Sequence, residues 1–116
     1  MKFMLMIIDD EPAQAKFSET EMRALFDQVG AVEAELKACH KLVDSRALRP
    51  SAEAATVWMR TGRPAVSDGP FSEAKEVLGG YFLIDCESKQ EAIEWARKFP
   101  PAGIAAIEVR PLWEMS

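Results

Sequence analysis

Residues 3–8 (FMLMII) and residues 81–86 (YFLIDC) decide the fold of this chain. Each run has the length of a strand, and neither is long enough to cross a bilayer. A strand with one face in water alternates apolar and polar residues, but residues 3–8 are apolar at every position. We therefore expect both faces of these two strands to be covered.

Two helices are predicted from their N-terminal signals. Residues 18–21 (SETE) form a capping box that predicts a helix ending near Ala38, and residues 88–91 (SKQE) form a second one that predicts a helix ending near Lys98. Apolar residues recur at helical spacing along the first helix and indicate one buried stripe: Met22, Leu25, Phe26, Val29, Val32 and Leu36.

The remaining segments read as short strands. Residues 42–45 form one candidate, residues 55–60 and 65–67 a hairpin, and residues 104–110 the last strand. The order strand, helix, short strands, strand, helix, strand is that of a ferredoxin-like split βαβ sheet. The prediction is an α+β fold with an antiparallel sheet and both helices on one face, formed by a single domain over residues 1–116.

The face of the sheet that the helices do not reach needs a different cover. A bare apolar face of several hundred Å² on a lone chain favours aggregation. The simplest cover is a second copy of the chain, sheet against sheet. We therefore expect a homodimer that resembles a dimeric α+β barrel.

Composition excludes several classes of function. The net charge of −5 argues against a nucleic-acid groove, which needs a positive face. The apolar start of the chain ends in Asp9-Asp10-Glu11, unlike a secretory cleavage site, and no segment predicts a membrane span. The two cysteines, Cys39 and Cys86, have no metal-type spacing and are expected to be reduced thiols in a cytoplasmic protein.

The most unusual stretch is residues 66–76 (VSDGPFSEAKE), followed by LGGYF at 78–82. Together with ALRP at 47–50, EAIEWA at 91–96 and IEVRP at 107–111, it resembles the DGPF proteins, a branch of the YCII-related family. The match covers about residues 1–112. The resemblance implies a bacterial protein with a ferredoxin-like fold, dimerised as an α+β barrel, and a pocket between helix and sheet.

Some YCII relatives are similar to small lyases or dehalogenating enzymes and use a His–Asp pair, with the histidine on the first helix. This chain has Glu21, Met22 and Arg23 in that region and no histidine on the helix. Its only histidine, His40, lies beyond the helix and matches no ligand of the family. A lone histidine does not form a metal site, so neither a metal nor a cofactor is expected.

Asp68 is the first candidate for a functional carboxylate. Placed before Gly69 and Pro70, its side chain could face a cavity and exchange a proton. The alternative is a turn in which the carboxylate accepts backbone N–H groups. Lys75 and Glu76 follow closely and could perturb the pKa of Asp68, or they form a solvated surface pair.

Four further residues are candidates for a pocket. Trp58, Phe71 and Tyr81 could line an apolar ligand site, and the alternative is ordinary barrel packing. Arg110 could pair with a substrate carboxylate, although a structural pair on the sheet is favoured. Gly79-Gly80 is expected to be a bend into a strand, since no phosphate-loop spacing accompanies it.

Three functions fit these residues. The first is a small enzyme in which Asp68 acts as general acid/base on a small organic molecule, with Lys75 or Arg110 orienting an anion. The second is a non-catalytic module that binds a small molecule or has a regulatory accessory role. The third is a structural dimer in which the Asp-Gly-Pro-Phe motif is only a turn.

Overall fold

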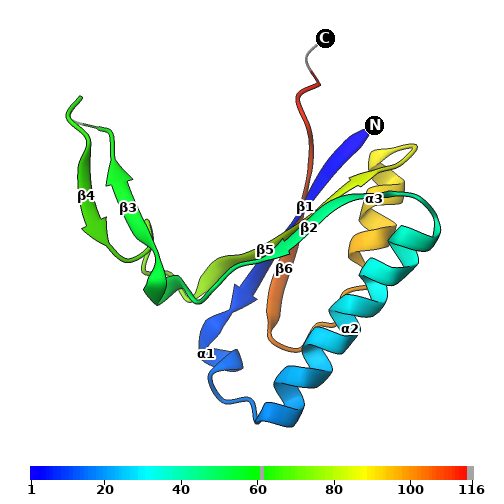
Figure 1. Cartoon of the computed structure of the whole chain (residues 1–116), viewed down its shortest axis with the longest axis horizontal. Helices are drawn as coiled ribbons and strands as arrows, with labels where there is room; N and C mark the ends of the chain where they lie inside the picture. Colours follow the sequence, from blue (N-terminus) through cyan, green and yellow to red (C-terminus); the bar gives the residue numbers. More distant parts are fainter. Residues whose placement is uncertain (61, 115–116) are drawn as a thin grey trace.

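The computed structural model describes residues 1–60 and 62–114. Four antiparallel strands form the main sheet in the order β2-β5-β1-β6: β2 (Leu42–Ala47), β5 (Glu76–Asp85), β1 (Lys2–Asp10) and β6 (Ile104–Pro111). Helices α2 (Glu19–Ala38) and α3 (Lys89–Ala96) both lie on one face of it (Figure 1). This is the predicted ferredoxin-like α+β arrangement, and the prediction is confirmed.

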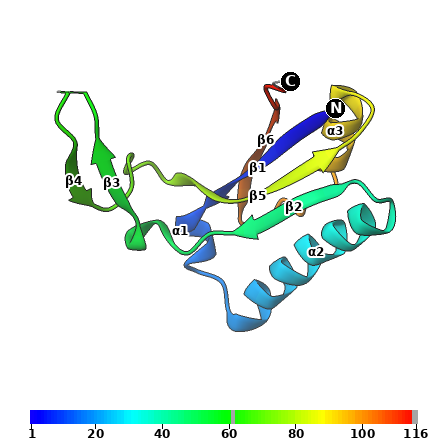
Figure 2. The same cartoon turned by 45° about the horizontal axis from the view of Figure 1, so that its top comes forward.

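The second sheet is a hairpin of β3 (Ala55–Trp58) and β4 (Ala65–Asp68), as predicted. We call these two strands the arm. The arm projects from one end of the main sheet, away from α2 and α3 (Figure 2). The short helix α1 (Glu11–Gln14) and the 3₁₀ turn η1 (Ser51–Glu53) have no counterpart among the predictions. None of the helices in residues 1–60 and 62–114 has the length and apolar composition to span a membrane.

The core lies between the sheet and the two long helices. Alternate residues of β1, namely Phe3, Leu5 and Ile7, point into it and are buried. Phe82 and Phe99 meet edge to face there, with ring centroids 5.0 Å apart. The apolar stripe predicted for α2 is confirmed at its buried positions: Leu25, Val32 and Leu36.

The opposite face of the main sheet is also largely apolar. We call it the open face; it carries Met4, Met6, Tyr81 and Leu83, all half-buried. The Tyr81 hydroxyl donates to Asp44 Oδ2 at 2.8 Å, which raises the pKa of the phenol. The pairs Arg46–Asp44 and Arg110–Glu108 border the apolar centre of the open face. Helices α2 and α3 lie on the other side of the sheet.

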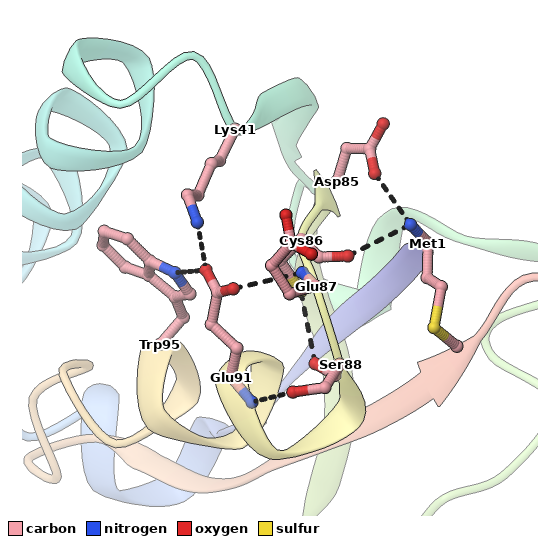
Figure 3. A network of polar contacts seen from close by, with 8 residues as sticks. All are labelled: Met1, Lys41, Asp85, Cys86, Glu87, Ser88, Glu91 and Trp95. Carbon is pink, nitrogen blue, oxygen red and sulfur yellow. Dashed lines mark hydrogen bonds and ion pairs between the residues drawn. The ribbon is translucent and has the colours of Figure 1, made fainter.

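A polar network fixes α3 to the end of α2 (Figure 3). Glu91 Oε2 accepts from Lys41 Nζ at 2.5 Å and from Trp95 Nε1 at 3.1 Å. Ser88 Oγ caps α3 by accepting from the Glu91 N–H, as predicted, but Oε1 of Glu91 accepts from the Glu87 N–H instead of the Ser88 N–H. The predicted second capping box is thus only half formed, because Lys41 and Trp95 hold the Glu91 carboxylate away from it.

His40 ends α2 in a left-handed conformation, with φ of 59°. Its N–H donates to the Lys37 carbonyl, and the Lys41 N–H donates to the Leu36 carbonyl. These two bonds are those of a Schellman motif, in which glycine is the usual residue at this position. The geometry explains His40 as a residue of the helix end.

Replacing His40 by glycine is therefore expected to stabilise the protein. An L-residue in this region is disfavoured by roughly 1 kcal/mol. His40→Gly should raise the free energy of unfolding by about that amount. For a chain of this length, a change of about 1 kcal/mol corresponds to a rise in Tm of about 4 °C. Urea and thermal unfolding measure it. His40→Val is the control and should lower the stability; equal stabilities of all three proteins would contradict this account.

The Glu91 network predicts a pH dependence. Hydrogen bonds from Lys41 Nζ and the Glu87 N–H lower the pKa of Glu91 in the folded protein. A carboxylate with a lowered pKa stabilises the fold above its unfolded pKa, and that stability is lost as the pH falls through the folded pKa. Wild type should thus exceed Glu91→Gln in urea stability at pH 7, with the difference vanishing in acid. A difference that stays constant with pH would contradict the prediction.

Candidate functional site

A cavity of about 420 Å³ lies between α2 and the main sheet. It is bordered by the C-terminal end of β1, the first half of β5 and the segment that follows β2. Its wall is mainly apolar, and its polar lining combines three carboxyl groups with Gln14, Ser45, Arg46 and Arg49. The site therefore occurs between helix and sheet, where the family resemblance places a pocket. We call this cavity the pocket.

Asp9 is the carboxylate that the sheet directs into the pocket. It follows Phe3, Leu5 and Ile7 in the β1 alternation, so its side chain points to the helix side of the sheet. The register with β5 shifts between Ile7 and Ile8, and the register with β6 shifts between Ile8 and Asp9. The two bulges thus flank Ile8, directly before Asp9, and bulges are common beside functional sites.

Gly79 makes room for the Asp9 carboxyl group. In the register with β5, Ile7 faces Gly80 and Ile8 faces Leu78, which leaves Gly79 as the extra residue of the bulge. A Cβ at Gly79 would lie 1.7 Å from Asp9 Oδ2, so only glycine accepts the carboxylate in this place. Gly79 and Gly80 lie inside β5, whereas the sequence had predicted a bend before the strand.

Asp9 and Glu11 occupy contrasting environments at the same side of the pocket. Burial raises the pKa of Asp9, the Gln14 side chain opposes that rise, and the negative charge of Glu11 adds to it. Glu11 instead accepts hydrogen bonds from the Ser51 hydroxyl and from the Ser51 N–H at 2.9 Å, which lower its pKa. One carboxyl group is thus favoured as an acid and the other as an anion, the pattern that separates acid and base roles.

The apolar wall comes from α2 and from the strand ends. Phe26 was predicted to lie in the buried stripe, but it is 60% exposed because it borders the pocket instead of the core. Leu48 and Leu78 border the same cavity and are also exposed. Large apolar side chains that remain accessible around a cavity are typical of a ligand site.

The cations near the pocket already have carboxylate partners. Arg49 donates to both oxygens of Glu53, at 3.2 and 2.9 Å. Arg46 pairs with Asp44 at 2.7 Å, and its carbonyl oxygen closely approaches Gly80. In the part of the chain that the structure describes, no cluster of three or more His, Cys, Asp or Glu residues is arranged to hold a metal ion.

The residues predicted from the DGPF motif lie outside this pocket. Asp68 ends β4 on the arm, where it is exposed and opposite Ala55. Lys75 is exposed, and its carbonyl accepts from the Glu11 N–H. Glu76 opens β5 opposite Asp10. The structure brings Lys75 and Glu76 close to the start of α1 and leaves Asp68 on the arm.

The predicted pocket residues lie in two other places. Trp58 and Phe71 pack together at the arm, with ring centroids 5.5 Å apart, and the Trp58 indole donates to Ser67. Tyr81 and Arg110 lie on the open face, where Arg110 pairs with Glu108 at 2.6 Å. Neither group lines the pocket.

Sequence reasoning missed Asp9 as a site residue. The available signal was a carboxylate directly after a fully apolar strand, at the end of residues 3–8. The alternation of Phe3, Leu5 and Ile7 gives its inward direction, but the space that receives its carboxyl group depends on the register with β5. Gly79 was noted in the sequence, but the residues next to it do not show that it lies against Asp9 across the sheet.

A ferredoxin-like α+β domain with an apolar, carboxylate-lined pocket between helix and sheet is the class of protein that this fold and site define. The chain belongs to the family with a YCII-related domain, whose family model matches residues 1–116. An uncharacterized protein of Rhizobium meliloti (strain 1021) is 35% identical over 114 residues, which is 97% of this chain and 92% of that protein. The resemblance to the YCII-related family is thus confirmed.

A solved structure shares the fold. It is 5-chloro-2-hydroxyhydroquinone dehydrochlorinase from Burkholderia phenoliruptrix AC1100, in complex with 2,5-dihydroxybenzoquinone. The TM-score is 0.50 with 18% sequence identity, and the match covers 100% of this chain and 96% of the other. At this identity the similarity shows the fold alone.

The contact between Asp9 and Gly79 predicts a non-additive pair of substitutions. Gly79→Ala should lower the free energy of unfolding by about 1 kcal/mol in the wild-type background, because the new Cβ displaces the carboxylate. In an Asp9→Ala background the atoms it would strike are gone, so the cost should largely disappear. Urea unfolding of the four proteins measures the coupling.

Gly80→Ala is the matched control. Its Cβ would lie 2.8 Å from the backbone oxygen of Arg46, which Asp9→Ala does not remove. The variant should therefore lose about 2 kcal/mol in both backgrounds. An additive result for Gly79→Ala with Asp9→Ala would contradict the placement of Asp9.

The raised pKa of Asp9 predicts that its charge destabilises the fold. An acid whose folded pKa is raised contributes stability below its unfolded pKa, and this is lost as the pH rises through the folded pKa. Asp9→Asn should therefore be at least as stable as wild type at pH 7, and its advantage should shrink in acid. Urea unfolding between pH 3 and pH 7 checks this; a variant that is less stable only at neutral pH would refute it.

Proposed function

We propose that the pocket binds a small uncharged organic molecule and that Asp9 exchanges a proton with it. The observation that carries this proposal is the Asp9 carboxyl group, half-buried directly after two bulges and seated over Gly79. A carboxyl group whose burial costs stability is favoured where it serves a function. Its raised pKa brings it closer to neutral pH, where general acid/base catalysis is most effective.

The pocket chemistry supports a neutral, largely apolar ligand with hydroxyl groups. Phe26, Leu48 and Leu78 supply the apolar surface. The lining holds three carboxyl groups against two guanidinium groups, and those two, of Arg46 and Arg49, are already paired with Asp44 and Glu53, so an anion is disfavoured. A hydroxylated ring fits these conditions. The protein of the same fold was solved with 2,5-dihydroxybenzoquinone, which is an anion at neutral pH; its reduced form, a tetrahydroxybenzene that is uncharged at pH 7, is therefore the suitable first probe.

The reaction class we propose is proton transfer at a ring carbon or oxygen, as in tautomerisation or elimination. Asp9 would take or give the proton, and Glu11 would stay ionised and favour the protonated form of Asp9. A non-catalytic binding module is the second candidate. It is supported by the absence of histidine from residues 19–38, because α2 then supplies no imidazole that could act as a general base together with Asp9.

The test compares two carboxylate variants on this probe. NMR measures binding through the resonances of Leu25 and Val29, and solvent deuterium entry into the ring C–H measures proton transfer. Wild type should bind and accelerate exchange, and Asp9→Asn should lose about 10²–10⁴-fold of the exchange rate while keeping the fold. Asp68→Asn is the matched control, an equal change on the exposed arm.

Three outcomes would count against catalysis by Asp9 in the pocket. Binding without accelerated exchange would favour the binding module. Exchange lost in Asp68→Asn and retained in Asp9→Asn would overturn the role of Asp9 and restore the motif carboxylate as the catalytic group. Shifts confined to residues outside the pocket would refute the site itself.

We also propose that two copies of the chain associate through their open faces. The chain exposes 8224 Å², whereas a folded monomer of 12.9 kDa is expected to expose about 6300 Å². Its radius of gyration is 15.8 Å, against about 13 Å for a compact domain of this length. The excess surface and the half-buried Met4, Met6 and Leu83 support a homodimer with the two sheets face to face.

A further inference from the structure

The arm has few partners of its own and is apolar on both sides. Val57 and Val66 face each other across the hairpin and are 54% and 71% exposed, with Met59 next to them at 66%. On the other side, the rings of Trp58 and Phe71 pack against one another, and Phe71 is 67% exposed. A two-stranded hairpin is marginally stable by itself, so an arm of this composition needs a cover.

The open face is too small to form a stable dimer alone. Four strands about 4.8 Å apart and about 26 Å long present roughly 500 Å². A standard interface takes about 800 Å² from each partner. The exposed surface of the chain in excess of a compact monomer is larger than the open face and larger than one side of a standard interface. The exposed apolar side chains of the arm can supply the interface area that the open face lacks.

Charge favours a second copy of this chain as the partner. Between Ala55 and Asp68 the chain carries Arg60 and Arg63 against Asp68, so this segment has a net charge of +1 while the rest of the chain carries −6. A weakly basic, apolar arm is therefore attracted to another acidic body of the same protein. In a symmetric pair, each arm covers its partner, and both apolar surfaces are buried by one contact.

The base of the arm is continuous with the pocket. A groove of about 710 Å³ lies there, lined by β3, by Phe71 and by the start of β5. Leu48, Arg49, Pro50 and Leu78 line both the groove and the pocket. A partner chain seated in this groove would cover Leu48 and Leu78 and thereby complete the outer wall of the pocket.

We propose that the arm and the groove at its base dock against a second copy of this chain, and that this copy closes the pocket. The inference builds on the proposed pairing of the open faces and adds a second, separate part to the interface. It makes the ligand site a property of the dimer, because the wall formed by Leu48 and Leu78 is incomplete in one chain.

Charge-adding substitutions on the arm test the docking. Val57→Glu and Val66→Glu change exposed side chains, so the chain should keep its circular dichroism spectrum. Sedimentation equilibrium should show a dimer for wild type and a dimer Kd raised at least 100-fold, about 2.7 kcal/mol, for each variant. Ala34→Glu adds the same charge to the outer surface of α2 and should leave the Kd unchanged.

A labelling experiment tests the closure of the pocket. With Cys39 replaced by serine, Leu48→Cys should react with a maleimide about tenfold more slowly in the dimer than in the same protein carrying Val66→Glu. Wild type that sediments as a monomer would overturn both the open-face pairing and the arm. Arm variants that stay dimeric, or Leu48→Cys labelling that does not change, would overturn the arm alone.

Discussion

The antiparallel pairing of β1 with β5 is the interaction on which the rest of this structure depends. On one side of the pair, Phe3, Leu5 and Phe82 form the core with the helices. On the other side, Met4, Met6 and Leu83 form the centre of the open face. At one end, Asp9 continues the alternation of β1 into the pocket, and the shift of register with β5 places Gly79 beside its carboxyl group. Core, proposed interface and candidate site are thus three consequences of one pair of strands.

The same pairing explains why the site tolerates a half-buried carboxyl group. Gly79 leaves space for it, Gln14 lies beside it, and the negative charge of Glu11 shifts the balance toward its protonated form. This arrangement gives a YCII-related chain an acid at the helix side of the sheet, although α2 carries no histidine. The membership of the family and the shared fold do not name the chemistry. The proposed chemistry, proton exchange with a neutral ligand, is supported by the carboxyl group and its apolar surroundings.

Local signals were sufficient to predict the fold. The Ser18 capping box, the buried positions of α2 and the arm hairpin all depend on residues close together in the sequence, and the structure confirms them. The alternation of Phe3, Leu5 and Ile7 assigns Asp9 to the helix side, but the space for its carboxyl group depends on Gly79, about 70 residues away, so no local pattern shows the site. The Asp-Gly-Pro-Phe motif drew attention to Asp68, but Asp68 lies on the arm, outside the pocket. An unusual motif can mark a required backbone conformation as readily as a reactive group.

The protonation state of Asp9 is the quantity that tests the central claim most directly. Its carboxyl carbon can be followed by ¹³C NMR during a pH titration of the protein, with Asp9→Asn to assign the resonance. The account predicts a midpoint clearly above the ordinary aspartate value of about 3.9, and a downward shift in Gly79→Ala, where the carboxylate is displaced toward water. A midpoint at or below the ordinary value would contradict it, since Asp9 would then be a solvated surface carboxylate.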